Sequence, residues 1–194
     1  KKKKNLLIRL LFYLDKITGK KSVPNYKIKI PEKFVKKARE LLPNDKKYIG
    51  FSITAGHPTR IKEISVKEII KVANHYAKNF IPTFFIEDKY LEIKEHLKTE
   101  IKNSFFPEEN IEKEFKKPML VTAMGALTEF NITIDNGISH MLSFSNSKNY
   151  IFFNKSSEKF KPSNNKSAIY DCEKTDKNID KLTSEEIINF IVKN

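Results

Sequence analysis

The sequence predicts an α/β fold: an open parallel sheet with flanking helices, preceded by a helical N-terminal arm. From Tyr48 onward, short buried strands alternate with helical segments of about ten or more residues, a spacing typical of parallel βαβ units. The chain has 194 residues, of which 39% are hydrophobic, and this is enough to form one domain with a substantial core.

The arm begins with an apolar helix predicted at Asn5–Thr18, which Gly19 ends. Apolar side chains occupy most of its circumference, and only Arg9, Asp15 and Lys16 interrupt them. Such a helix packs against another surface or lies on a membrane.

A linker is expected after this helix. It contains a short alternating strand at Tyr26–Ile30 and, behind Pro31, a helix at Glu32–Leu42. The break at Pro43–Asp45 marks the predicted boundary, with the arm and linker in 1–47 and the sheet domain in 48–194.

The sheet domain reads as five strands separated by helices. The strands are expected at Tyr48–Ile53, Ile81–Ile86, Asn131–Ile134, Tyr150–Phe153 and Ser167–Tyr170. The helices are expected from Ser65 to Ala77, at Glu87–Ile101, Pro118–Thr128 and Gly137–Phe144, and from Thr183 to Val192. Two of them start with a predicted capping box, Ser65 with Glu68 and Thr183 with Glu186.

The composition is strongly basic, with a net charge of +13 and a pI of about 9.6. Residues 1–21 carry much of this charge, since they hold eight basic side chains and one acidic one. This balance indicates nucleic acid, anionic lipid or anionic metabolites as partners, although AT-rich coding would also enrich lysine.

Several classes of protein are disfavoured by the sequence. It has no run of 18 apolar residues and no secretory signal, and the single Cys172 forms no internal disulfide. We therefore expect a cytoplasmic protein, peripheral on the inner membrane if the arm binds lipid. No hydrolase, Walker or RNA-binding motif is present, and the four histidines are not spaced for a metal, so no cofactor, metal or nucleic-acid partner is expected.

The loops that follow the strands are the first candidates for a site, because parallel sheets bind ligands outside the carboxyl ends of their strands. They are the loop after Ile53 (TAGHPTRIKEIS), the loop after Ile86, the turn at Asp135, and the loop after Phe153 (NKSSEKFKP).

The turn in ITIDNGISHML reads as a strand, Asp135, a turn and a helix. Asp135 is suited to sugar hydroxyls, and Gly137 is expected to allow a sharp turn and close approach of a ligand. The helix start, with Asn136 and with His140 one turn later, is suited to an anion. The alternative is a simple helix cap with His140 as a packing residue.

The loop after Ile53 supplies hydroxyls, a glycine and two cations. Thr54, Gly56, Arg60 and Lys62 are its candidate ligand residues, because lysine and arginine both bind phosphate. A solvated basic loop is the plainer interpretation.

Together, TAGHPTRIKEISVKEI and ITIDNGISHML resemble glycosyltransferase family 9, the heptosyltransferases of lipopolysaccharide core synthesis. FNKSSEKFKP and LTSEEIINFI are similar to two later segments of that family, in the same order. The resemblance spans roughly Tyr48 to Val192. It implies the C-terminal, Rossmann-like half of a GT-B fold, which binds the nucleotide-activated sugar.

The resemblance also implies roles for single residues. Thr54 and Lys62 would contact the diphosphate, with Lys62 stabilising the charge of the leaving group in an inverting transfer. Asp135 would hold sugar hydroxyls, and Asn136, Gly137 and His140 would frame the phosphates. Glu87 or Asp88 would meet the nucleotide, which is expected to be ADP-linked.

The family's other domain binds the acceptor, and residues 1–47 do not resemble it. We therefore expect a glycosyltransferase that is incomplete or weakly active as this chain alone, with a second chain as one source of the acceptor domain. Its expected partners are a nucleotide sugar, a lipid-linked saccharide acceptor and an anionic membrane that residues 1–21 would contact. An inactive homologue or interaction module remains the alternative, and a nucleic-acid-binding domain is less favoured.

Overall fold

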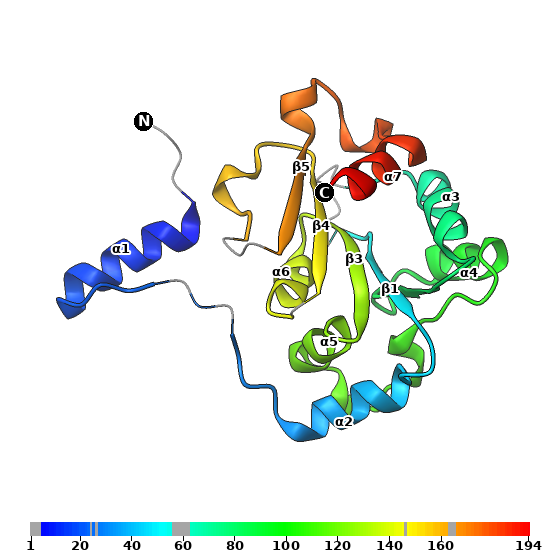
Figure 1. Ribbon diagram of the computed structural model, residues 1–194, viewed down its shortest axis with the longest axis horizontal. Coiled ribbons are helices and arrows are strands. Elements are labelled where there is room, and N and C mark those ends of the chain that lie inside the picture. The colour runs from blue at the N-terminus through cyan, green and yellow to red at the C-terminus, as the bar shows by residue number, and fades with distance from the viewer. Residues whose placement is uncertain (1–4, 24, 26, 56–62, 146, 163–165) are drawn as a thin grey trace.

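The computed structural model describes residues 5–23, 25, 27–55, 63–145, 147–162 and 166–194 (Figure 1). Five strands form one sheet: β1 (Tyr48–Ser52), β2 (Ile81–Phe84), β3 (Thr128–Ile134), β4 (Lys148–Phe153) and β5 (Ser167–Asp171). The helices are α1 (Leu6–Thr18), α2 (Glu32–Leu41), α3 (Val66–Tyr76), α4 (Leu91–Glu100), α5 (Pro118–Gly125), α6 (Gly137–Ser143) and α7 (Ser184–Lys193).

All strand pairs of the sheet are parallel, and the order is β2-β1-β3-β4-β5. The predicted α/β class with an open parallel sheet is therefore confirmed. β1 lies between β2 and β3, so the chain leaves β1 toward one edge of the sheet and later returns to its other side.

Helices cover both faces of the sheet, which explains why most strand residues are buried (Figure 1). On one face, Ile49, Phe51 and Phe152 pack under α3, α4 and α7. On the other, α2, α5 and α6 form a second core that includes Phe34 and Leu120. The strands present Gly50, Asn131 and other small or polar side chains to this second face, as the close approach of Gly50 to Asn131 and Phe85 shows.

The arm is the least integrated part of the fold. α1 stands away from the sheet domain (Figure 1). Asn5 caps α1, Gly19 ends it in the left-handed conformation, and none of its residues is buried. α2 instead packs against α5, with Phe34 and Ala38 buried. The boundary at residues 47 and 48 stays a prediction.

Three local expectations are wrong. Residues 27–30 form no strand, because no described segment pairs with them. The helix expected from Glu87 begins only at Leu91, since Asp88 and Tyr90 are held in the preceding loop by tertiary contacts. The helix expected up to Thr128 ends at Gly125, and Thr128 already begins β3.

One of the two capping boxes forms. Thr183 and Glu186 make both reciprocal bonds at α7. At α3, Ser65 makes no side-chain cap bond, because the Glu68 N–H donates to the Ser65 carbonyl at 3.0 Å. The Glu68 carboxylate accepts from Lys71 and from the Ser184 N–H. These bonds lower the pKa of Glu68 to about 2, Lys71 first and Ser184 second.

Candidate functional site

The candidate site lies at the point where the strand order reverses, between the carboxyl ends of β1 and β3. Ser52 of β1 is the register partner of Thr133 in β3, so the segments that follow these strands leave the sheet side by side. Open α/β sheets bind ligands in the crevice at such a switch point. The structure thus brings Thr54 close to the turn at Asp135–Gly137.

Asn136 joins the two segments. Its side-chain oxygen accepts a bond of 2.9 Å from the Ser139 N–H and so caps α6. Its amide nitrogen donates to the Ser52 hydroxyl at 2.8 Å and to the Thr54 carbonyl at 3.1 Å. The amide therefore fixes the turn after β3 against the end of β1, and the expected contact of Asn136 with phosphate stays a prediction.

Asp135 and His140 lie on either side of this cap. Asp135 is half-buried, and its backbone N–H donates to the Phe152 carbonyl of β4 at 3.2 Å. His140 is half-buried in α6, so the helix brings it to the same end of the sheet. Their roles toward a sugar phosphate remain predictions.

Gly137 occupies the first position of α6, but not for the expected reason. Its backbone has no positive φ, so a sharp turn that only glycine adopts is absent here. A Cβ added at Gly137 would meet nothing within 4 Å, and the residue is exposed. Open space beside the backbone agrees with the close approach of a ligand.

The stem of the loop after β1 is held from two sides. The Ala55 N–H donates to the Glu63 carboxylate at 2.6 Å, and the Tyr90 hydroxyl donates to the Ala55 carbonyl at 2.5 Å. These two positioning residues were not expected from the sequence. The candidates Gly56, Arg60 and Lys62 lie outside the described residues.

A cavity of about 210 Å³ lies beside the switch point. Its walls are mainly apolar side chains of α5, of α6 and of the segment that leads into α5: Phe115, Leu120, Val121, Met124, Ile138 and Met141. Glu87, the acid expected to meet a nucleotide, lines the same cavity. Ile138 follows Gly137 directly, which joins the cavity to the Asp135 turn.

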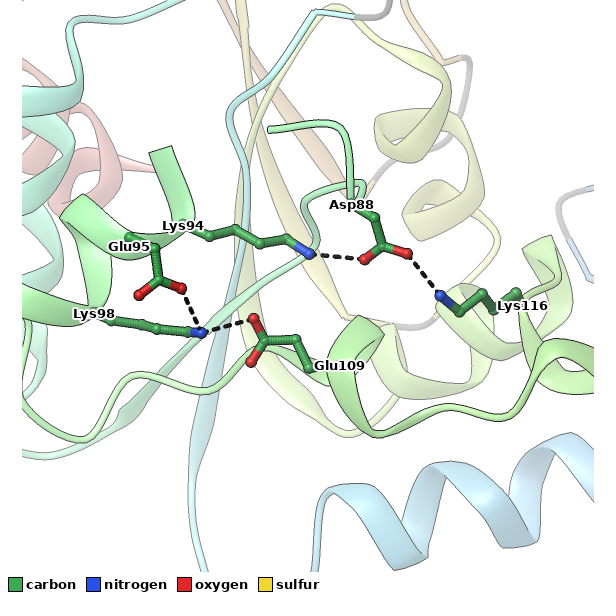
Figure 2. A network of polar contacts seen from close by, with 6 residues as sticks. All are labelled: Asp88, Lys94, Glu95, Lys98, Glu109 and Lys116. Atoms are coloured by element: carbon green, nitrogen blue, oxygen red, sulfur yellow. Dashed lines mark hydrogen bonds and ion pairs between the residues drawn. The ribbon is translucent and has the colours of Figure 1, made fainter. Parts of the chain in front are cut away.

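Ion pairs join three segments next to the cavity (Figure 2). Asp88, in the loop after β2, accepts from Lys94 of α4 at 3.0 Å and from Lys116, before α5, at 2.7 Å. The hydrogen bonds from Lys116 and then Lys94 lower the pKa of Asp88. Because Lys116 lines the cavity, this pairing holds one of its polar residues in place.

The segment between α4 and α5 also contributes Glu108, which sequence reasoning missed. The sequence signal that could have drawn attention to this segment is Lys116-Lys117-Pro118, a basic pair directly before a helix start at the carboxyl edge of the sheet.

The loop after β4 is held at Ser157, whose N–H and hydroxyl both donate to Asp171 at 3.0 Å. Its expected role toward phosphate stays a prediction.

Within the part of the chain that the structure describes, no three His, Cys, Asp or Glu side chains gather as metal ligands, and no helix is both long and apolar enough to cross a membrane. Cys172 is buried. Burial is the larger cause that raises the pKa of its thiol to about 11, and the negative charge of Asp171 is the next.

No protein-family model matches the sequence, and no curated protein matches it. Solved structures do. The glycosyl transferase family 9 structure from Veillonella parvula superposes on the whole chain with a TM-score of 0.80 at 14% identity, over 62% of its own length. The fold is that of part of a family 9 glycosyltransferase.

Two Escherichia coli enzymes agree with this fold. The heptosyltransferase WaaC with ADP-2-deoxy-2-fluoro heptose matches 93% of the chain and 53% of its own length, with a TM-score of 0.68 at 15% identity. The ADP-heptose heptosyltransferase II matches 86% of the chain and 52% of its own length, with a TM-score of 0.68 at 12% identity. The chain therefore spans between about half and three fifths of these enzymes.

Proposed function

We propose that this chain binds the nucleotide-activated sugar of a glycosyl transfer reaction. The observation that carries the proposal is the apolar cavity at the switch point, which is joined to the Asp135 turn through Ile138. A cavity of 210 Å³ is smaller than typical sites of about 300–1,000 Å³ for whole ligands, so it suits one part of a ligand, such as a planar base. The sugar and diphosphate would then extend over Asp135 and the loop after β1.

Different residues of the site bind the sugar, bind the diphosphate and stabilise the leaving group in this proposal. Asp135 accepts hydrogen bonds from sugar hydroxyls, and Thr54, Asn136, Gly137 and His140 surround the diphosphate. Lys62, with Gly56 and Arg60 in the same loop, neutralises the charge that develops on the departing nucleotide diphosphate. An ADP-heptose-like donor is supported by the similar WaaC structure, which holds an ADP-linked fluoroheptose.

For the acceptor, we propose a class of molecule but no binding residues. Because the chain matches 52 to 62% of the length of the similar enzymes, inverting transfer to a lipid-linked saccharide is assigned to an assembled site. The remaining part of that site would come from the same polypeptide or from a second chain. The described chain alone is expected to bind the donor and to transfer the sugar slowly or not at all.

Calorimetric titration with ADP and ADP-heptose tests the donor site. Asp135→Ala and Lys62→Ala are each expected to weaken binding by about 10- to 100-fold, because each removes a charged partner worth about 1.5–3 kcal/mol. Asp45→Ala and Lys78→Ala remove exposed charges of the same kinds just before β1 and β2, at the opposite edge of the sheet, and should leave affinity unchanged. Absence of binding by folded wild-type protein would refute the donor site.

A second proposal concerns α1, which we infer binds the surface of an anionic membrane. Leu6, Leu10, Tyr13, Leu14 and Ile17 recur at helical spacing and are exposed, Ile17 by 83%. Arg9, Lys16, Lys20 and Lys21 are exposed around this stripe. An apolar face flanked by cations matches the interface of anionic lipid, where each basic residue contributes about 1 kcal/mol.

Co-sedimentation with vesicles checks this assignment. The chain should bind phosphatidylglycerol-containing vesicles at least about tenfold better than phosphatidylcholine vesicles, and salt should weaken binding. Leu10→Asp should abolish binding, whereas Val192→Asp, an equally polar change at an exposed site on α7, should not. A dimer in solution that Leu10→Asp dissociates, without vesicle binding, would instead make α1 a protein interface.

A further inference from the structure

Glu108 is the one carboxyl group of the cavity wall that no cation holds, among the residues that the structure describes. The other charged residues nearby already have partners. Glu87 pairs with Lys89 at 2.7 Å. Lys116 pairs with Asp88 at 2.7 Å, as Figure 2 shows. Glu108 lines the cavity and is half-buried. Its side-chain carboxylate makes no hydrogen bond or ion pair with any described residue. A half-buried acceptor without a donor gains most from a ligand that brings one.

The position of Glu108 is set by its surroundings and not by its own contacts. It belongs to a short 3-10 helix, Pro107–Asn110, in which Pro107 is buried. Glu109, the next residue, is tied to Lys98 of α4 at 2.8 Å (Figure 2). This anchor leaves Glu109 on the outside and the Glu108 side chain on the cavity wall.

The charges around Glu108 favour a hydrogen-bond donor in the cavity. Burial raises the pKa of Glu108, and so does Asp88, while Lys116 and Lys94 oppose the shift and Glu87 adds to it. The carboxylate is thus less well stabilised than one in water. A ligand that donates a hydrogen bond supplies the missing stabilisation, and one that presents a carbonyl oxygen adds repulsion.

We propose that Glu108 selects nucleobases that carry an exocyclic amino group over those that carry an oxo group at the same position. This inference rests on the proposed donor site, and it adds the residue that reads the base. Adenine and cytosine donate from such an amino group, whereas hypoxanthine and uracil present an oxygen there. Sites built around a buried polar group discriminate more sharply than apolar walls do, because a mismatched ligand leaves that group unpaired.

Two pairs of nucleotides isolate this contact, since ADP differs from IDP, and CDP from UDP, by the exchange of an amino group for an oxo group. Calorimetry on the full chain is expected to show at least about tenfold tighter binding of the amino member of each pair that binds. In Glu108→Gln, the amide also donates, so the preference should fall to within about threefold, through tighter binding of the oxo nucleotides. Glu114→Gln, the same change at an exposed position of the segment, should keep the wild-type preference.

The outcomes separate the two claims. If the folded wild-type chain binds none of the four nucleotides, the proposed donor site itself fails. If it binds nucleotides but treats the members of a pair alike, or if Glu108→Gln keeps the wild-type preference, the donor site stands and the role of Glu108 is refuted. Thermal unfolding of each variant verifies that a loss of binding is not a loss of fold.

Discussion

Replacing Gly50 by alanine is expected to lower the free energy of unfolding by about 3 kcal/mol. Gly50 lies in β1, and an added Cβ would stand 2.0 Å from the side-chain oxygen of Asn131 and 3.0 Å from the ring of Phe85. Asn131 has little freedom to move aside, because the same oxygen accepts a buried hydrogen bond from Thr128 at 3.0 Å. β1 is paired on both edges, so its backbone is also held in place.

Urea unfolding followed by circular dichroism measures this loss, and Gly137→Ala is its matched control. At Gly137 the added methyl group would meet nothing and the backbone has no positive φ, so stability should be unchanged or raised by up to about 1 kcal/mol. Equal stability of Gly50→Ala and wild type would show that β1 and β3 are not packed as described.

Asp88→Ala is expected to have an effect of similar size, about 3 kcal/mol. The side chain of Lys94 is only 1% exposed, and its ammonium group has Asp88 as its ion-pair partner in the described structure (Figure 2). Removing the carboxylate leaves this charge buried and unpaired, and such a loss usually costs more than the pair itself contributes. Lys116, which is more exposed, should tolerate the loss.

The double variant Asp88→Ala with Lys94→Met tests this cause. Methionine keeps the apolar stem and removes the charge, so the double variant should recover most of the lost stability in urea unfolding. Glu95→Ala breaks a surface pair with Lys98 and is expected to cost no more than about 1 kcal/mol. A double variant as unstable as Asp88→Ala would mean that the cost arises from the loop and not from the buried charge.

The class of fold and the order of its elements could be predicted because they depend on local patterns. Apolar runs such as Tyr48–Ser52 and the helical period of Ser184–Lys193 are visible along the chain. The order of the strands is not, since the placement of β1 between β2 and β3 depends on contacts far apart in the sequence. The first residue of a helix also cannot be predicted from local sequence when tertiary contacts determine it. Before α4, the contacts of Asp88 and Tyr90 do so.

In the candidate site, too, features set by local sequence could be predicted, and features set by distant contacts could not. The position of Asp135, Gly137 and Thr54 at the carboxyl edge of the sheet could be predicted because they directly follow predicted strands, and a general rule makes that edge the first candidate for a ligand site. The cavity could not, because Glu87, Glu108, Phe115 and Ile138 come from four separate segments. For Asn136, the sequence indicated only a helix cap. Its hydrogen bonds to Ser52 and Thr54 could not be predicted, because those residues lie more than eighty positions away in the sequence.

The all-parallel sheet has a consequence for how this chain reaches its native state. Among the five described strands, no pair closes through a hairpin, so every strand pair requires a crossover connection. The segment between β1 and β3 contains β2 and its flanking helices. Loop entropy must be spent before such contacts form, which makes sheets of this kind slow to fold compared with helical bundles. Because β1 pairs with both β2 and β3, we expect substitutions around Gly50 to slow folding more than substitutions at the edge strands β2 and β5.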